Sequence, residues 1–217
     1  MIAELSKYVS SSFADVSGKV FCSGRSSFRQ RGGIYVLGYN PGGDPETHGT
    51  ETVSRHTNYV MSDAPDRWSA YMDEVWQGRG SVMQTRMQYL FRALKLDPRQ
   101  VPSSNLIFTR SRRGADLKMK SRELINLCWK FHAEVIKQLQ PAAIICLGSD
   151  CGSVVRTKVG GGLIDTLSER YEGRSWASYA WQRADCPAII QITHPSVADW
   201  TNAAADPVPM IRRVMEH

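Results

Sequence analysis

The chain has 217 residues, of which 42% are hydrophobic and 22% charged, and it carries a formal net charge of +6 with a pI near 9.2. This length and composition predict one globular domain over residues 1–217. No window approaches the roughly 18 consecutive apolar residues of a membrane span, and the N-terminus lacks the basic start and apolar core of a signal peptide, so we expect a cytoplasmic protein without membrane contact.

The first predicted elements are a helix, a loop and a buried strand. Apolar residues recur at helical spacing over residues 2–16, which predicts an amphipathic helix on one side of the core. A loop rich in Ser, Arg and Gly follows over residues 22–33. The apolar run at residues 34–37 then predicts a buried strand.

The loop at residues 38–45, of sequence GYNPGGDP, follows this strand directly. In open α/β sheets, ligands bind at the carboxyl ends of strands. The prolines limit the freedom of the loop, the glycines let a ligand approach the backbone, and Asn40 and Asp44 supply polar groups. The loop is therefore a candidate site, and a plain strand-to-helix turn is the alternative interpretation.

Residues 46–66 form a polar stretch longer than an ordinary connection, which predicts a loop able to form a pocket wall or lid. We expect His48 and His56 within it to be exposed to solvent rather than to act as ligands. Aromatic and apolar residues at positions 68–76, and again at 83–94, repeat at helical spacing and predict two core-facing helical segments.

A second predicted strand spans residues 103–109 and carries the polar Asn105, followed by a basic turn. Residues 121–139 predict a helix, and residues 142–147 predict a third strand that ends at Gly148-Ser149.

The last third of the chain contains a fourth predicted strand. Residues 154–167 predict a helix interrupted by three glycines, and residues 171–184 are an excursion or a short hairpin. The strand at residues 188–193 runs straight into His194-Pro195-Ser196, and a closing helix is predicted over residues 207–215. Together these elements predict a three-layer α/β/α sandwich around a short, mostly parallel, four-stranded sheet.

The five cysteines are an odd number, and most of them have apolar neighbours. This pattern predicts buried free thiols rather than a disulfide framework. Cys146 and Cys151 are the closest pair, but no second Cys or His pair at ligand spacing accompanies them. We therefore expect no metal and no other cofactor.

Basic residues are concentrated between Arg79 and Arg122, where the only acids are Asp97 and Asp116, whereas residues 40–76 hold seven acids and two arginines. One-sided basicity is what binding to a polyanion requires. An ordinary solvated surface is the alternative interpretation.

Four short motifs stand at strand ends in a fixed order: Gly-Tyr-Asn-Pro-Gly from Gly38, Ser-Asn-Leu around Asn105, Leu-Gly-Ser at the third strand and His-Pro-Ser from His194. This order resembles the uracil-DNA glycosylase superfamily over residues 34–200. The first motif is similar to the mismatch-specific and single-strand-selective branches. The segment from Asn105 to Pro141 is similar to the mismatch-specific branch. His-Pro-Ser departs from that branch, which usually has Asn-Pro-Ser, and resembles the single-strand-selective and general uracil branches.

The resemblance implies a role for each motif residue. Asn40 would orient the attacking water through its amide, and His194 would donate a hydrogen bond to O2 of the departing base. Asn105 would present a donor and an acceptor to the base edge. Asp44 is a second candidate for activating the water, with capping of a turn or helix as the alternative. The other residues expected at the base are Gly38, Tyr39, Gly42 and Gly43, and those expected at DNA phosphates are Ser149, Ser196, Arg110, Arg112 and Arg113.

Pocket size and the DNA wedge follow from the same resemblance. General uracil enzymes of the superfamily have a bulky tyrosine two places after the catalytic position, where this chain has Gly42, so we expect room for 5-substituted pyrimidines. The loop after His194 should enter the DNA in place of the flipped base, with Trp200 as the largest candidate wedge and Val197 and Ala198 nearer the usual position. A buried core role is the alternative for Trp200.

These expectations describe a monomeric, monofunctional DNA glycosylase for uracil or a 5-modified pyrimidine, whose partner is DNA. The motifs hold no obvious catalytic lysine for Schiff-base chemistry, so we expect no strand cleavage. A glycosylase for hypermodified pyrimidines in foreign DNA is one alternative. A nucleic-acid-binding module without turnover is the other.

Overall fold

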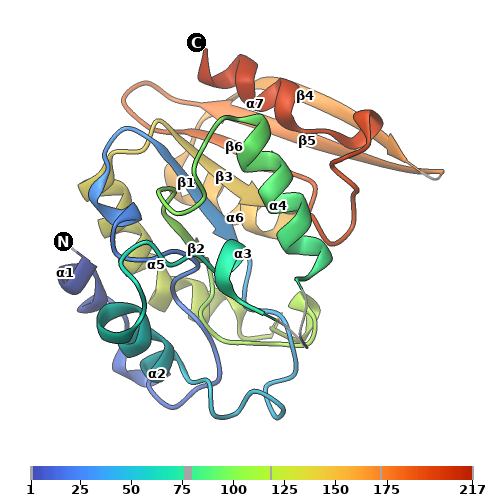
Figure 1. Ribbon diagram of the computed structural model, residues 1–217. Helices are drawn as coiled ribbons and strands as arrows, with labels where there is room; N and C mark the ends of the chain where they lie inside the picture. Colours follow the sequence, from blue (N-terminus) through green and yellow to red (C-terminus); the bar gives the residue numbers. More distant parts are fainter. Residues whose placement is uncertain (1, 76–79, 118, 172, 217) are drawn as a thin grey trace.

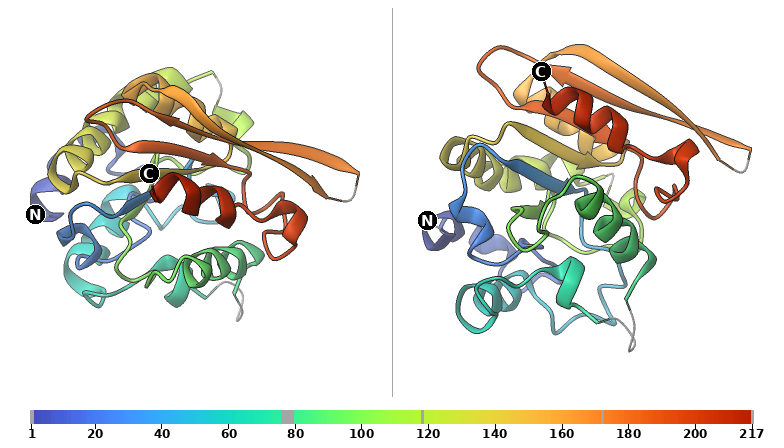
Figure 2. Two further views of the ribbon diagram at one scale, coloured as in Figure 1. Left: turned by 90° about the horizontal axis from the view of Figure 1, so that it is seen from above. Right: turned by 45° about the horizontal axis from the view of Figure 1, so that its top comes forward.

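The computed structural model describes residues 2–75, 80–117, 119–171 and 173–216. A single six-stranded sheet runs through the molecule, and helices flank both of its faces (Figures 1 and 2). The predicted α/β architecture with a mostly parallel sheet is confirmed. The predicted number of four strands is wrong, because two more strands extend the sheet at one edge.

The sheet has the strand order β2-β1-β3-β6-β5-β4. Its four-strand parallel part comprises β2, β1, β3 and β6, while β5 and β4 are antiparallel additions. The bounds are β1 Ile34–Gly38, β2 Ser103–Asn105, β3 Ala143–Leu147, β4 Gly162–Tyr171, β5 Arg174–Gln182 and β6 Ala188–Ile192.

The two strands that sequence reasoning missed form a long hairpin beyond β6 (Figure 2). Gly160, with φ of +88°, ends the preceding helix, and Gly161, with φ of +130°, begins the turn into β4. The three glycines therefore end the helix rather than interrupt it. The outer strand escaped notice because exposed residues such as Leu163 and Ile164 give it no clear alternation of buried and polar positions.

The helices agree with the predictions in the core and differ near the N-terminus. Their bounds are α1 Ile2–Ser6, α2 Val53–Asn58, α3 Ala70–Asp73, α4 Val82–Ala93, α5 Ser121–Leu139, α6 Ser149–Val159 and α7 Val208–Met215. The first helix is much shorter than predicted. Its region continues as a separate 3-10 turn over Ser11–Phe13, because the Ser10 side chain accepts a hydrogen bond from the backbone of Ser12.

The polar stretch at residues 46–66 is a loop only in its first half. The Thr52 side chain accepts a hydrogen bond from the Arg55 backbone amide and starts α2, which passes directly into a π-helical turn at Tyr59–Asp63. His56 lies on the buried side of α2 with 5% of its surface exposed. The expectation that His56 is solvent-exposed is therefore wrong.

The segment after this turn is helical only over α3. Trp68 and Tyr71 are buried, as predicted, whereas Met72 and Val75 are exposed. Trp76 lies outside the described residues.

Hydrophobic residues pack on both faces of the sheet. One core lies between the sheet and α5 and α6, and includes Leu37, Phe108 and Phe131. The other lies between the sheet and α4 and α7, and includes Val36, Leu90 and Trp200. The strands of the parallel part are buried on both faces, which explains their continuous apolar runs.

All five cysteines are free thiols, as predicted, but only Cys128, Cys146 and Cys151 are fully buried, while Cys22 and Cys186 are partly exposed. Among the described residues, no helix is long and apolar enough to cross a membrane.

Candidate active site

The carboxyl ends of β2, β1, β3 and β6 meet at one edge of the sheet (Figure 1). Gly38 pairs in register with Asn105, and Leu147 pairs with Ile192, so the segments that carry Asn40, Asn105 and His194 leave the sheet together. Strands β1 and β6 are separated only by β3, which places their ends about 10 Å apart. That spacing can hold a pyrimidine nucleoside between the loops.

The loop after β1 is fixed by hydrogen bonds to the segment after β2. The backbone amides of Leu106 and Ile107 donate to the carbonyls of Gly38 and Tyr39, each at 2.8 Å, and Ser111 N donates to Pro41 O at 3.2 Å. Backbone hydrogen bonds between these two segments thus continue beyond the end of β2. This loop is consequently an ordered platform for Asn40.

The Asn40 amide has a defined orientation. Its Nδ2 donates to Pro41 O at 2.9 Å, to Thr109 O at 3.3 Å and to Ser111 Oγ at 2.8 Å. Because carbonyl oxygens only accept hydrogen bonds, these contacts identify the nitrogen side of the amide. The opposite atom, Oδ1, accepts no hydrogen bond from the described part of the chain, so it is available to a water molecule.

His194 has a defined tautomer by the same reasoning. The Ser196 backbone amide donates to His194 Nδ1 at 3.1 Å, and Ser196 Oγ lies 2.7 Å from the same atom. An Nδ1 that accepts from a backbone amide carries no proton, so the neutral ring is protonated at Nε2. Burial lowers the pKa of His194, which favours this neutral form.

Gly148 lies beside His194 in a backbone conformation that favours glycine. A Cβ at position 148 would lie 3.4 Å from His194 Cβ, and Gly148 has a φ of +93°. Glycine thus allows the backbone to turn from β3 into α6 beneath the histidine.

Asn105 is buried, and its side chain lies next to the backbone of Gly38. Its Oδ1 lies 3.2 Å from the position that a Cβ of residue 38 would take. Its Nδ2 donates to Lys19 O at 3.3 Å and to Cys22 Sγ at 3.5 Å. The expectation that Asn105 presents both a donor and an acceptor is therefore corrected: the donor side is engaged by the chain, and Oδ1 remains as the acceptor.

The Asp44 side chain caps a turn near the end of the loop at residues 38–45. Its Oδ1 accepts from Glu46 N at 3.1 Å, and its Oδ2 pairs with Arg112 Nη2 at 2.6 Å. The Arg112 hydrogen bond and the Glu46 amide lower the pKa of Asp44, which weakens it as a base. Of the two interpretations of Asp44, the structure favours the turn cap.

Gly42 and Gly43 differ in what surrounds them. A Cβ at Gly42 would meet nothing within 4 Å, so this position faces open space. Gly43 has a φ of +107°, and a Cβ there would lie 3.2 Å from the His48 ring and 3.3 Å from Arg110 Nη1. Position 43 therefore requires glycine, whereas position 42 tolerates a side chain.

The Tyr39 ring packs against the segment that follows β2. The ring touches Gly114 and packs beside Ile107, Leu117 and Ile125. Tyr39 is half-buried there.

The expected phosphate contacts fall into three groups. Ser149 is exposed at the first position of α6, where the unpaired amides of a helix start suit an anion. Ser196 is exposed, and its hydroxyl also contacts His194. Arg112 and Arg113 are exposed at the surface, and Arg112 pairs with Asp44.

Arg110 is a structural residue, and its assignment to DNA phosphates is wrong. Only 5% of its surface is exposed. Its guanidinium donates to Gly42 O, forms an ion pair with Glu51 and lies 3.3 Å from Ser17 Oγ. These contacts hold the loop of Gly42 against the neighbouring segment, and the burial of the guanidinium keeps it out of reach of DNA.

The acidic and basic segments of the sequence neutralise each other in part. Among the described residues, three acids of residues 40–76 pair with basic residues of 79–122: Asp44–Arg112, Glu51–Arg110 and Asp73–Arg99. The basic surface available to DNA is therefore smaller than the sequence suggests. The exposed basic residues of this segment include Arg92, Arg113, Lys120 and Arg122. Arg79 and Lys118 lie outside the described residues.

The assignment of Trp200 as a DNA wedge is wrong, and Ala198 shares its burial. Both side chains are fully buried. The Trp200 ring belongs to the core beside α4 and α7, and its Nε1 donates to Thr193 O at 3.1 Å. Val197 is 46% exposed and is the residue of this loop that remains available as a wedge.

Sequence reasoning missed several residues of this edge. Ser111 orients Asn40, and Lys19 contacts Asn105 through its backbone. Neither stands in a motif, and both act across large separations in the chain. Arg110 stands out in the sequence as part of a basic turn, but the sequence does not show that it forms an ion pair with Glu51.

No protein-family model matches this sequence, and no curated protein matches it with significant similarity. The assignment of function therefore depends on the motifs and on the geometry of this sheet edge.

Proposed function

We propose that this chain is a monofunctional DNA glycosylase that hydrolyses the N-glycosidic bond of uracil or a 5-modified pyrimidine flipped out of DNA. The observation that carries the proposal is the pairing of two fixed polar groups at one sheet edge: the free Oδ1 of Asn40 and the Nε2–H of a neutral His194. The resemblance to the uracil-DNA glycosylase superfamily assigns the same two positions to catalysis.

His194 acts on the leaving base. As the glycosidic bond breaks, negative charge develops on O2 of the pyrimidine, and a fixed donor at that atom stabilises the transition state. The neutral ring donates from Nε2, while Ser196 holds Nδ1. A donor that is already oriented needs no reorganisation during the reaction.

Asn40 acts on the water. Its Oδ1 accepts a hydrogen bond from the water and aims the oxygen lone pair at the anomeric carbon. The sugar carries positive charge at this stage, so an oriented water reacts without a strong base, and the proton that it loses neutralises the departing pyrimidine anion. Asp44 is not needed as that base, since Arg112 and the Glu46 amide stabilise its charged form.

The DNA has to present its base outside the helix, because the reacting bond is unreachable in a stacked duplex. The start of α6 at Ser149 would hold a flanking phosphate, and Arg112 and Arg113 would approach the backbone. Val197, the exposed residue of the loop after His194, would fill the space that the base leaves.

The state of Lys19 supports hydrolysis without strand cleavage. Its Nζ lies 2.6 Å from Glu74 Oε1 and 3.1 Å from Glu51 Oε1. Burial, which alone would lower the pKa of Lys19, is outweighed by the two carboxylates, and the pKa is raised. A protonated ammonium cannot attack the sugar as a nucleophile, so Schiff-base chemistry is not expected.

A second candidate is a glycosylase for hypermodified pyrimidines in foreign DNA. The open space beside Gly42 favours it, because a bulky 5-substituent needs such room.

Single-turnover incubation with oligonucleotides that each contain one test base, followed by alkali, tests the proposal. We expect abasic sites with at least one pyrimidine, and no abasic sites with the Asn40→Ala protein. Binding to every oligonucleotide without any abasic site would instead identify a nucleic-acid-binding module. Strand breaks before alkali would contradict the monofunctional mechanism.

A further inference from the structure

Arg86 on α4 contacts the loop that carries His194. Its Nη1 donates to Pro195 O, and its Nε lies 3.6 Å from Asp199 Oδ1. The two contacting residues Arg86 and Pro195 are 109 positions apart in the chain. Arg86 belongs to the basic segment that the sequence offers to a polyanion, but its guanidinium is engaged by this loop.

The carbonyl that Arg86 contacts belongs to the peptide unit that fixes the His194 ring. The N–H of the same unit is the Ser196 amide, which donates to His194 Nδ1 at 3.1 Å. This peptide is trans, and the C=O and N–H of a planar trans peptide point in opposite directions. A donor that holds the carbonyl of Pro195 therefore also fixes the direction of the amide toward the imidazole.

The charge of Arg86 acts along the same path. Hydrogen bonds from an ionised donor are stronger than those between neutral groups, and a carbonyl that accepts one makes the N–H of its own peptide a better donor. A better donor at Nδ1 favours the form of the His194 ring that has no proton on this atom. That form carries its proton on Nε2, the atom proposed to contact O2 of the base.

The turn after β6 is closed by its own backbone. Val197 N and Ala198 N donate to His194 O at 2.9 and 3.2 Å. These bonds fix the shape of the turn, but they join residues of the turn to one another. Arg86 links the turn to a separate element, α4, and so determines where the turn lies relative to the rest of the protein.

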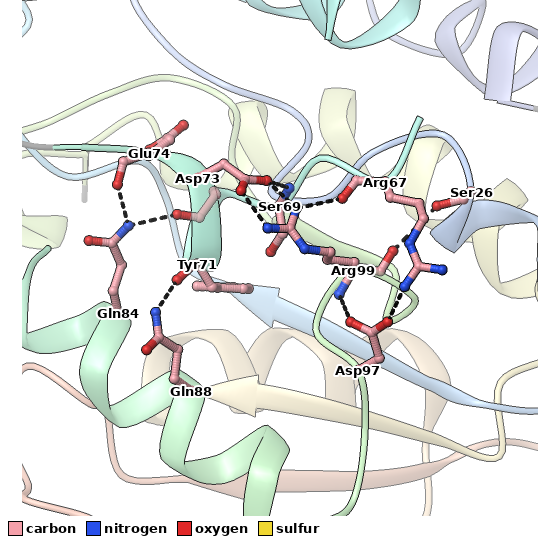
Figure 3. Close-up of polar contacts among 11 residues, drawn as sticks. Ser26, Arg67, Ser69, Tyr71, Asp73, Glu74, Gln84, Gln88, Asp97 and Arg99 are labelled. Carbon is pink, nitrogen blue, oxygen red and sulfur yellow. Dashed lines mark hydrogen bonds and ion pairs between the residues drawn. The ribbon is translucent and has the colours of Figure 1, made fainter. Parts of the chain in front are cut away.

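The helix that supplies Arg86 is itself firmly attached (Figure 3). Gln84 Nε2 donates to Glu74 O and Gln88 Nε2 donates to Tyr71 O, each at 2.7 Å. Positions 84 and 88 share one face of a helix, whereas position 86 lies on roughly the opposite face. One face of α4 is therefore held by the segment of α3, while Arg86 extends from the other.

A direct contact with a DNA phosphate is the other role that an arginine of this segment could have. The Arg86 side chain is only 16% exposed, and its guanidinium already contacts a carbonyl and a carboxylate. These observations favour a role within the protein.

We propose that Arg86 is a positioning residue that holds His194 in the Nε2-protonated form through the Pro195–Ser196 peptide. The effect of Arg86 on catalysis rests on the proposed glycosylase function. Its effect on the histidine ring can be measured without DNA, so the two can fail separately.

The test observes the ring and the reaction independently. In protein with isotopically labelled histidine, nitrogen NMR at a pH where His194 is neutral reports which ring nitrogen carries the proton, and His194→Gln assigns the signals. We expect Nε2–H alone in the wild-type protein and a mixture of both neutral forms in Arg86→Met. Arg86→Lys keeps a charged donor and should restore the wild-type form.

The same proteins are compared in single-turnover excision from a duplex that contains one uracil or, where the wild type excises another pyrimidine instead, that base. Arg86→Met should lower the rate about tenfold and change the affinity for DNA less than about twofold, because Arg86 orients a donor and does not contact DNA. Arg86→Lys should recover part of the rate, since a lysine cannot reproduce both contacts of the guanidinium.

Arg212→Met is the matched control. Arg212 Nη2 also donates to a backbone carbonyl of α4, but to that of Ala93 at the last residue of the helix, at 2.6 Å. The control removes the same charge and the same kind of contact, and it should change neither the ring nor the rate. Thermal unfolding shows whether each variant is folded. If Arg86→Met is unfolded, Arg86→Gln, which keeps a neutral donor, must show the same change in weaker form.

An unchanged proton position in the folded Arg86 variant would overturn the inference. A loss of DNA affinity in place of a loss of rate would also overturn it and would identify Arg86 as a phosphate contact. A changed proton position, combined with no excision of any base by the wild-type protein, would refute the proposed function and support the link between Arg86 and His194.

Discussion

Ser111 Oγ accepts a hydrogen bond from Asn40 Nδ2 at 2.8 Å and donates its own proton to Arg113 O at the same distance. The hydroxyl is buried between the loop of Asn40 and the turn that follows β2. It thus helps to fix which side of the Asn40 amide faces the sheet edge. Ser111 is a positioning residue in the proposed mechanism.

Ser111→Ala should lower the single-turnover rate about tenfold, because the Asn40 amide loses a fixed partner while its two carbonyl contacts remain. Affinity for DNA should stay unchanged, as measured by fluorescence anisotropy. In the Asn40→Ala background, the second substitution should have no further effect on the rate. Additive losses in the double variant would show that Ser111 acts independently of Asn40.

Gly42→Tyr should abolish excision of 5-substituted pyrimidines and spare excision of uracil. The new side chain enters open space, so the fold is retained, and the ring closes the region beside position 5 of the base. Gly43→Ala provides the contrast: its φ of +107° and the neighbouring His48 ring make even a methyl group destabilising. Parallel thermal unfolding and base-panel excision measure both effects. Unchanged excision of all bases by Gly42→Tyr would contradict the pocket assignment.

Val197→Ala should reduce excision from duplex DNA more than from single strands, because only a duplex requires a wedge to replace the flipped base. Trp200→Ala should instead lower the free energy of unfolding by about 3–5 kcal/mol, the usual cost of removing a large buried aromatic side chain. Urea unfolding and paired excision assays distinguish these outcomes. Equal losses on both substrates for Val197→Ala would remove this residue as the wedge.

Local pattern was enough to predict β1, β3 and β6 and the motifs at the carboxyl edge of the sheet, whereas β2 ends at Asn105, four residues before its predicted end. The run at residues 34–37 is buried on both faces, and α5 spans Ser121–Leu139 within the helix expected between Ser121 and Pro141. The sequence of the β4–β5 hairpin shows no clear alternation of apolar and polar residues, because much of the hairpin is exposed. The pairing between the two strands stabilises it instead. Strands at the edge of a sheet are therefore the part of this fold that sequence predicts least.

The errors at the site have a different cause, which is pairing between distant residues. Glu51 neutralises Arg110 across 59 positions, and the Lys19 carbonyl engages the Asn105 amide across 86 positions. Neither partner is evident from spacing or composition. Trp200 illustrates the same limit, because an aromatic residue in a loop is equally compatible with a surface wedge and a core side chain until its surroundings are known.

The buried histidines predict how the free energy of unfolding depends on pH. Burial, together with the charges of Lys19 and Arg110, lowers the pKa of His56 to about 3, and burial lowers the pKa of His132 to about 4 despite its hydrogen bonds to backbone carbonyls. An unfolded histidine has a pKa of about 6.5. The unfolded chain therefore binds protons at a higher pH than the folded chain, so stability is complete above pH 6.5 and falls as the pH drops toward 4.

Within this window each of these histidines lowers the free energy of unfolding by about 1.4 kcal/mol per pH unit. Urea unfolding between pH 7 and pH 5 should show this loss, to which His194 adds because burial lowers its pKa too, and His56→Phe should make the slope shallower. An unchanged slope in that variant would show that His56 takes up a proton in the folded protein as readily as in the unfolded chain.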